Sequence, residues 1–105
     1  DKSFANKTEF DADFQDFITE TAWGSTWSRE GILSHRDRSL LTLCLLAAGG
    51  NEAEFELHLR ATVNTGATKE EVREMLMHTA VYAGIPVANH YIKIAKEIYD
   101  EMESE

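Results

Sequence analysis

The sequence lacks what a disulfide-bonded, a nucleic-acid-binding or a membrane-spanning protein needs. It has one cysteine and one proline in 105 residues, and 10 Lys and Arg stand against 19 Asp and Glu, for a net charge of −9. One cysteine excludes an intramolecular disulfide and suits a reducing cytoplasm, where we expect the protein. The acidic balance disfavours nucleic acid and anionic membranes as partners.

Long apolar runs are also missing. The longest, residues 40–48, is too short to cross a bilayer, and the chain opens without a signal-peptide pattern. A chain of this length suits a single domain, residues 1–105. Because so short a chain buries only a modest share of its surface, we expect it to form a homo-oligomer.

Helix signals recur, and strand signals are scarce. Thr8 is a candidate N-cap for a helix over 8–22, with an apolar face of Phe10, Phe14, Phe17 and Ile18. Residues 23–35, with two Trp, two Gly and three Ser, break this period and predict an ordered loop. Residues 36–49 are apolar on all sides after a basic start, which is typical of a helix in a core or a subunit interface.

Residues 51–65 alternate apolar and polar, as in a strand, yet Asn51 with Glu54 resembles a capping box and Gly66 suits a C-cap. We predict a helix there. Thr68 with Glu71 predicts a second capping box, before a helix over 69–83. Pro86 suits the start of a last helix, whose apolar stripe comprises Val87, Tyr91, Ile94, Ala95, Ile98 and Met102. The sequence thus predicts an all-α fold of about five helices.

Three groups of side chains are candidates for chemistry. His58 shares a helical face with Glu54, as a general acid or base with its orienting carboxylate or as a plain surface pair. Glu74, His78 and Tyr82 form a similar row, either a secondary acid/base group and pocket wall or an interhelical hydrogen-bonding face. The third group comprises three arginines, Arg29, Arg36 and Arg38, beside Trp23 and Trp27. These arginines form either a carboxylate-binding pocket or ordinary surface ion pairs.

Metal and thiol chemistry have weak support. The four histidines, at 35, 58, 78 and 90, form no HxxxH or HExxH pair, so we expect no metal. Cys44 lies in an apolar run, where a thiolate is disfavoured.

Three segments, WGSTWSREGILSHRDRSLLTL, ELHLRATVNTGATKEEV and VYAGIPVANH, closely resemble the gamma-carboxymuconolactone decarboxylase family. The resemblance implies an alkylhydroperoxidase D-like helical fold in a homo-oligomer, a hexamer or a trimer. It also implies a cofactor-free decarboxylation of 4-carboxymuconolactone to 4-oxoadipate enol-lactone and CO2, in the beta-ketoadipate pathway. Peroxidase relatives carry a CxxCxxxH motif, whose cysteine positions here hold Asn51 and Glu54, so a dithiol peroxidase mechanism is excluded.

The resemblance also suggests roles. His58, held by Glu54, would donate the proton, with His78 as a secondary candidate. The substrate-binding candidates are Arg36, Arg38, Arg29, Trp27, Tyr82 and Asn89. The alternatives are a same-fold enzyme acting on another small lactone or oxo-acid, or a non-catalytic helical assembly module.

Overall fold

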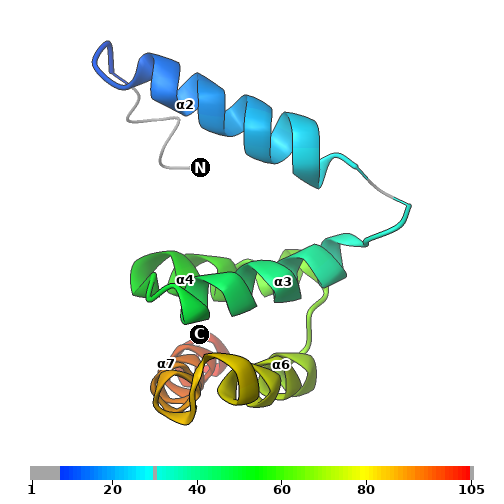
Figure 1. The fold of residues 1–105 in the computed structure, drawn as a ribbon, viewed down its shortest axis with the longest axis vertical. Coiled ribbons are helices and arrows are strands. Elements are labelled where there is room, and N and C mark those ends of the chain that lie inside the picture. Colours follow the sequence, from blue (N-terminus) through cyan, green and yellow to red (C-terminus); the bar gives the residue numbers. More distant parts are fainter. Residues whose placement is uncertain (1–7, 30, 105) are drawn as a thin grey trace. The chain divides into compact units, whose positions relative to one another are not determined.

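Every regular element is helical in the residues that the computed structural model describes, 8–29 and 31–104 (Figure 1). The all-α prediction is therefore confirmed for this part of the chain. The contacts between residues divide the chain into two compact units, residues 1–33 and 34–105. Across the described ranges, no helix combines the length and apolar character that crossing a membrane requires.

The first unit contains an α-helix, α2 (Ala12–Ile18), that continues as a π-helix, η1 (Thr19–Trp27). Two expectations are wrong here. The predicted loop begins only after Trp27, because the wider π turns carry the helix through Gly24 and Ser25. Thr8 caps nothing: its backbone N–H and hydroxyl both donate to Asp11 Oδ1, at 2.6 and 2.8 Å, and the helix begins after Asp11.

Neither helix of the first unit contains a buried side chain. The predicted apolar face is only partly helical, since Phe10 precedes α2, and all its members are exposed, from Ile18 at 39% to Phe10 at 99%. The rings of Trp23 and Trp27 lie 5.5 Å apart and pack on each other. This unit therefore has helical periodicity without a core.

The second unit begins with α3 (His35–Ala48), followed by α4 (Glu52–Arg60) and the single turn α5 (Thr62–Thr65). The helix predicted over 51–65 is thus two helices that meet at Ala61. The capping box expected at Asn51 is absent. The Asn51 amide lies back over Gly49, 2.9 Å from the point a Cβ there would occupy, instead of reaching the helix N–H groups. Gly66 ends α5 with φ +88°, as predicted.

Capping boxes fix the starts of two helices. Thr68 and Glu71 bond reciprocally at 2.9 and 3.1 Å, as predicted, at the start of α6 (Lys69–Ala83). A second capping box, which the sequence analysis missed, joins Ser34 and Asp37 at the start of α3. Gly84, at φ +113°, ends α6 and leads into α7 (Ile85–Glu103), with proline in its first turn.

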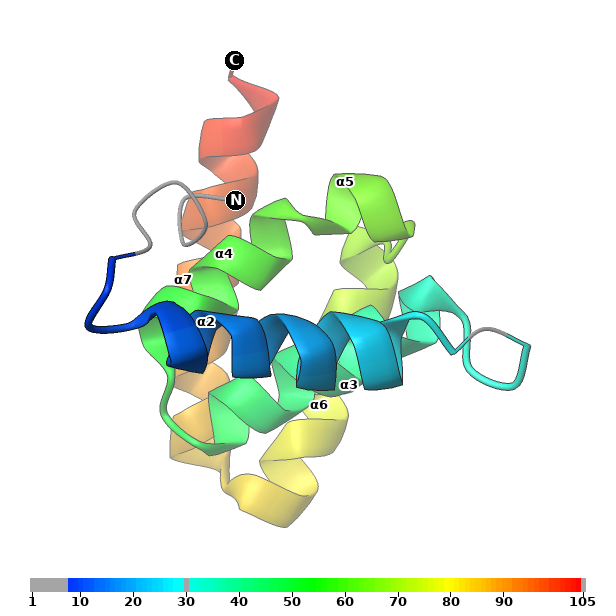
Figure 2. The same cartoon turned by 90° about the horizontal axis from the view of Figure 1, so that it is seen from above.

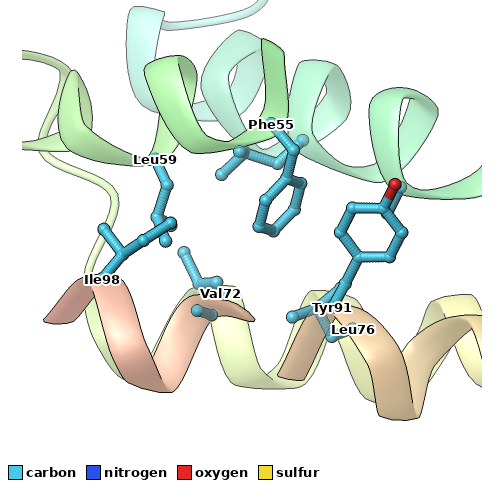
Figure 3. Close-up of a cluster of buried hydrophobic side chains, with 9 residues drawn as sticks. Phe55, Leu59, Val72, Leu76, Tyr91 and Ile98 are labelled. Carbon is cyan, nitrogen blue, oxygen red and sulfur yellow. The ribbon is translucent and has the colours of Figure 1, made fainter. Parts of the chain in front are cut away.

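The core of the second unit lies between α3 and α4 on one side and α6 and α7 on the other (Figure 3). The predicted stripe of α7 faces it, and the rings of Phe55 and Tyr91 meet edge to face at 4.8 Å. Figure 2 shows α7 extending past the other helices of this unit toward its C-terminal end. The nine core residues are Leu43, Ala47, Phe55, Leu59, Val72, Leu76, Tyr91, Ala95 and Ile98.

Candidate active site

His58 lies in the last turn of α4, between the buried Phe55 and Leu59. Its position next to two core residues makes it half-buried, with 28% of the side chain exposed. Glu54 lies one turn earlier, and its Oε2 is 3.8 Å from His58 Nε2. At that distance the carboxylate and the imidazole are neighbours, but the separation is too long for a hydrogen bond. The imidazole is therefore adjacent to a carboxylate without being hydrogen-bonded to it.

A second histidine–carboxylate pair joins α7 to α4, and the sequence analysis missed it. His90 Nε2 and Glu52 Oε1 are 2.7 Å apart, a full hydrogen bond, although both side chains are more than half exposed. The His90 ring also packs edge to face on Tyr91, at 5.2 Å. Spacing could not have revealed the pair, because its members are 38 residues apart and meet only when α7 packs on α4.

Arg36 occupies the first turn of α3, where two carboxylates compensate a charge that opposes the helix dipole. Its Nη2 is 3.2 Å from Asp37 Oδ1, and its Nη1 is 3.2 Å from Glu71 Oε2. The guanidinium therefore links the capping boxes of α3 and α6. The hydrogen bond from Arg36 also lowers the pKa of Asp37.

The other predicted carboxylate-binding residues lie in both units. Arg38 is half-buried in the first turn of α3, and its carbonyl accepts a 2.8 Å hydrogen bond from the Thr42 hydroxyl. Trp27 and Arg29 belong to the first unit, at the end of η1 and just beyond it. Arg38 and His58 therefore belong to the second unit, whereas Trp27 and Arg29 belong to the first.

The remaining candidates are surface residues. His78 and Tyr82 stack at 5.0 Å on the exposed side of α6, where Tyr82 is 80% exposed. Asn89 is exposed on the first part of α7. In the described ranges, His, Cys, Asp and Glu side chains form no group of three that would hold a metal ion.

Cys44 packs inside the helical unit. Its Sγ is 3.4 Å from the Thr79 hydroxyl, so this half-buried thiol links α3 to α6. Thr79 in turn donates to the Met75 carbonyl at 2.9 Å. These contacts give Cys44 a packing role between two helices.

The second unit is thus a small helical domain that has a half-buried imidazole beside a carboxylate on α4 and two arginines in the first turn of α3. Residues 12–97 match the carboxymuconolactone decarboxylase family, and the chain belongs to that family. The prediction made from the three motifs is confirmed.

Two characterised relatives are similar over nearly the whole chain. A 4-carboxymuconolactone decarboxylase of Acinetobacter baylyi is 43% identical over 101 residues, which cover 96% of this chain and 75% of that protein. A nitrosuccinic acid decarboxylase of Metarhizium robertsii is 37% identical over 102 residues, 97% of this chain and 71% of that protein. Both names describe the loss of CO2 from a small acid.

Proposed function

We propose that this protein is a carboxy-lyase that converts 4-carboxymuconolactone to 4-oxoadipate enol-lactone and CO2 without a cofactor. The observation that carries the proposal is the 43% identity to a 4-carboxymuconolactone decarboxylase over 96% of the chain. The second relative, also named a decarboxylase, supports the same reaction class on a different acid. An enzyme of this fold that acts on another small lactone or oxo-acid is the alternative.

The substrate explains why no cofactor is required. Its departing carboxylate is on the gamma carbon of an unsaturated lactone. When the C–C bond to that carboxylate breaks, the electron pair moves through the double bond onto the lactone carbonyl oxygen. The lactone is thus the electron sink that a pyridoxal or thiamine cofactor provides elsewhere. Protonation of carbon then gives the enol-lactone.

Arg36 and Arg38 hold the substrate carboxylates in this proposal. An arginine offers five N–H donors in a planar fork that matches a carboxylate. Asp37 contacts Nη2 of Arg36, and Glu71 contacts Nη1. Because each terminal nitrogen carries two N–H groups, other N–H donors of Arg36 remain for a ligand. Replacing Arg38 with Lys should weaken substrate binding, because lysine lacks the bidentate fork.

His58 delivers the proton to carbon, with Glu54 fixing the imidazole once the 3.8 Å gap closes around a bound substrate. His78 is the secondary candidate. The developing oxyanion takes hydrogen bonds from Tyr82 and Asn89, which are exposed and can reach a ligand.

A homo-oligomer, a hexamer or a trimer, completes the proposal. The second unit leaves large apolar side chains exposed on several helices, and burying them between copies of the chain would be favourable. They include Leu41 and Leu45 on α3, the helix whose composition is typical of a core or a subunit interface. Further exposed apolar side chains are Leu57, Val63, Met77, Val81, Ile85 and Ile92. Sedimentation velocity tests this directly, and a monomer at micromolar concentration would contradict it.

The activity is tested with the purified protein and 4-carboxymuconolactone, following enol-lactone and CO2 in equal amounts. Nitrosuccinic acid serves as the comparison substrate, since a relative is named for it. We expect the higher kcat/KM with the lactone. No turnover of the lactone, or faster turnover of nitrosuccinic acid, would contradict the proposed substrate.

A further inference from the structure

Two helices of the second unit, α6 and α7, meet in an elbow at Gly84, whose φ of +113° suits glycine. Around the elbow, Met77 is 58% exposed, and Val81 and Ile85 are each 74% exposed. Met77 and Val81 are one turn apart on α6, and Ile85 begins α7. These three side chains define an elbow patch, at the yellow turn between the two helices in Figure 2.

The segment around the elbow patch has no charged side chain. Residues 75–92 contain no Asp, Glu, Lys or Arg, although these residues make up 28% of the chain. Core positions explain only part of this, because Ala83 and Pro86 are exposed, as the patch residues are. Depletion of charge together with methionine is typical of the centre of a protein–protein interface. The elbow patch therefore has the composition of an interface.

Charge identifies a second copy of the chain as the partner. Two molecules that each have a net charge of −9 repel each other wherever their carboxylates meet. At the elbow patch, two identical surfaces can meet without bringing like charges together. The charged residues that precede it on α6, Arg73 and Glu74, are 3.6 Å apart and compensate each other. A cationic partner protein would instead be drawn to the carboxylates elsewhere on the surface.

Other exposed apolar side chains of the second unit lie closer to charge or to the candidate site. Leu57 is one turn from Glu54 on α4, so two copies of that face would bring carboxylates together. Leu41 is one turn from Arg38, which the proposed mechanism assigns to the substrate. Tyr82 is also assigned to the substrate, so the elbow patch is defined without it.

We propose that two copies of the chain pair through the elbow patch, with Met77, Val81 and Ile85 of one copy packed on the same three side chains of the other. The inference rests on the homo-oligomer of the proposed function and goes beyond it by locating one of its contacts. A contact between identical patches is isologous and joins subunits in pairs. It therefore requires an even number of subunits, as in a hexamer and not in a trimer.

Val81→Asp adds a carboxylate to the patch, and Val63→Asp is its matched control. Val63, on α5, is 72% exposed against 74% for Val81, and it lies outside the patch. Both variants are checked for parental helix content by circular dichroism and compared with the parent by sedimentation at a series of concentrations. We expect Val81→Asp to weaken pairing about tenfold or more, because two carboxylates would meet in an apolar contact. Val63→Asp should stay within about threefold of the parent.

A pair of opposite charges tests whether the contact is isologous. Val81→Lys alone should also weaken pairing, because two ammonium groups would meet. An equal mixture of the Val81→Asp and Val81→Lys proteins should associate at least about fivefold more tightly than either variant alone, since each carboxylate then faces an ammonium group. A patch that met a different surface of the second copy would give no such recovery.

Unchanged pairing in Val81→Asp, equal weakening by Val63→Asp, or no recovery in the mixture would each overturn the proposal. Changed tryptophan emission at unchanged mass would show that the first unit, which holds Trp23 and Trp27, covers the patch instead. A monomeric parent would contradict the proposed homo-oligomer as well, whereas an assembled parent that Val81→Asp leaves intact contradicts this contact alone. The proposed decarboxylation is measured by turnover, so its outcome is separate.

Discussion

The two units of this chain have the same kind of sequence pattern and different packing. Both have apolar residues at helical spacing, but α2 and η1 bury no side chain, whereas α3, α4, α6 and α7 enclose nine. The difference lies in the partner surfaces. In the second unit, the apolar faces of α3, α4, α6 and α7 pack against one another. In the first unit, α2 continues directly into η1, so no second helix packs against this face within the unit. Periodicity therefore predicts a helix, and a core also requires a second surface.

The largest expected effect on stability is in the core of the second unit. Phe55 has no exposed surface and packs on Tyr91. Phe55→Ala should lower the free energy of unfolding by about 3–5 kcal/mol, through lost burial and the cavity left behind. Urea denaturation followed by circular dichroism measures this. A loss under about 1 kcal/mol would mean that the core described here is not the one that holds the unit together.

Phe14 provides the contrasting substitution, since it belongs to the exposed stripe of α2. We expect Phe14→Asp to weaken self-association about tenfold or more, because burial of such a side chain in an interface contributes about 1.5–3 kcal/mol. Sedimentation at a series of concentrations measures the shift. Both tryptophans lie in the first unit, so their fluorescence reports on its environment. Unchanged mass and unchanged emission would show that the stripe faces water.

Two of the three expected N-caps, Thr68 and Thr8, allow a smaller test of the same contrast. Thr68 accepts a 3.1 Å hydrogen bond from the Glu71 N–H, whereas Thr8 donates to Asp11 and caps no helix. Thr68→Ala should destabilise the protein by about 1 kcal/mol. Thr8→Ala should change stability by no more than a few tenths of a kcal/mol. Thermal unfolding of the pair compares them, and equal losses would contradict the assigned caps.

The smallest expected effect is a pH dependence at the start of α3. The hydrogen bond from Arg36, and those with Ser34, lower the pKa of Asp37 in the folded protein. The folded state therefore binds this proton less readily than the unfolded state. The stabilisation is present above the ordinary aspartate pKa of about 4 and is lost as the pH falls through the folded value. Asp37→Asn should flatten the fall in stability in acid. If Asp37→Asn left the fall of stability with decreasing pH unchanged, Asp37 would not contribute to the acid sensitivity of the fold.

Local chemistry explains which parts of the fold were predictable. Thr68, Glu71 and Gly66 act through residues within one turn. Their spacing alone therefore predicted the capping box at the start of α6 and the glycine that ends α5. The π-helical continuation through Trp27 was not predictable, because Gly24 and Ser25 favour a loop locally. The capping box at Asn51 failed because its side chain lies over Gly49.

The candidate site was less predictable than the fold. Glu54 and His58 share one helix, so helical spacing placed them together. The pairing of His90 with Glu52 and that of Arg36 with Glu71 are tertiary contacts between distant residues. Family motifs identified the reaction class, but no motif fixes which side chains converge on a substrate.

The two histidine–carboxylate pairs allow the most direct test of the proposed mechanism. His58 is half-buried beside Glu54, and His90 is exposed and bonded to Glu52. Turnover of 4-carboxymuconolactone is compared for His58→Ala and His90→Ala, both verified as folded. We predict that His58→Ala lowers kcat by about 10²–10⁴-fold, the usual contribution of a general acid, and that His90→Ala stays within about threefold of the parent. A loss of that size with His90→Ala, and near-parental turnover with His58→Ala, would contradict the account.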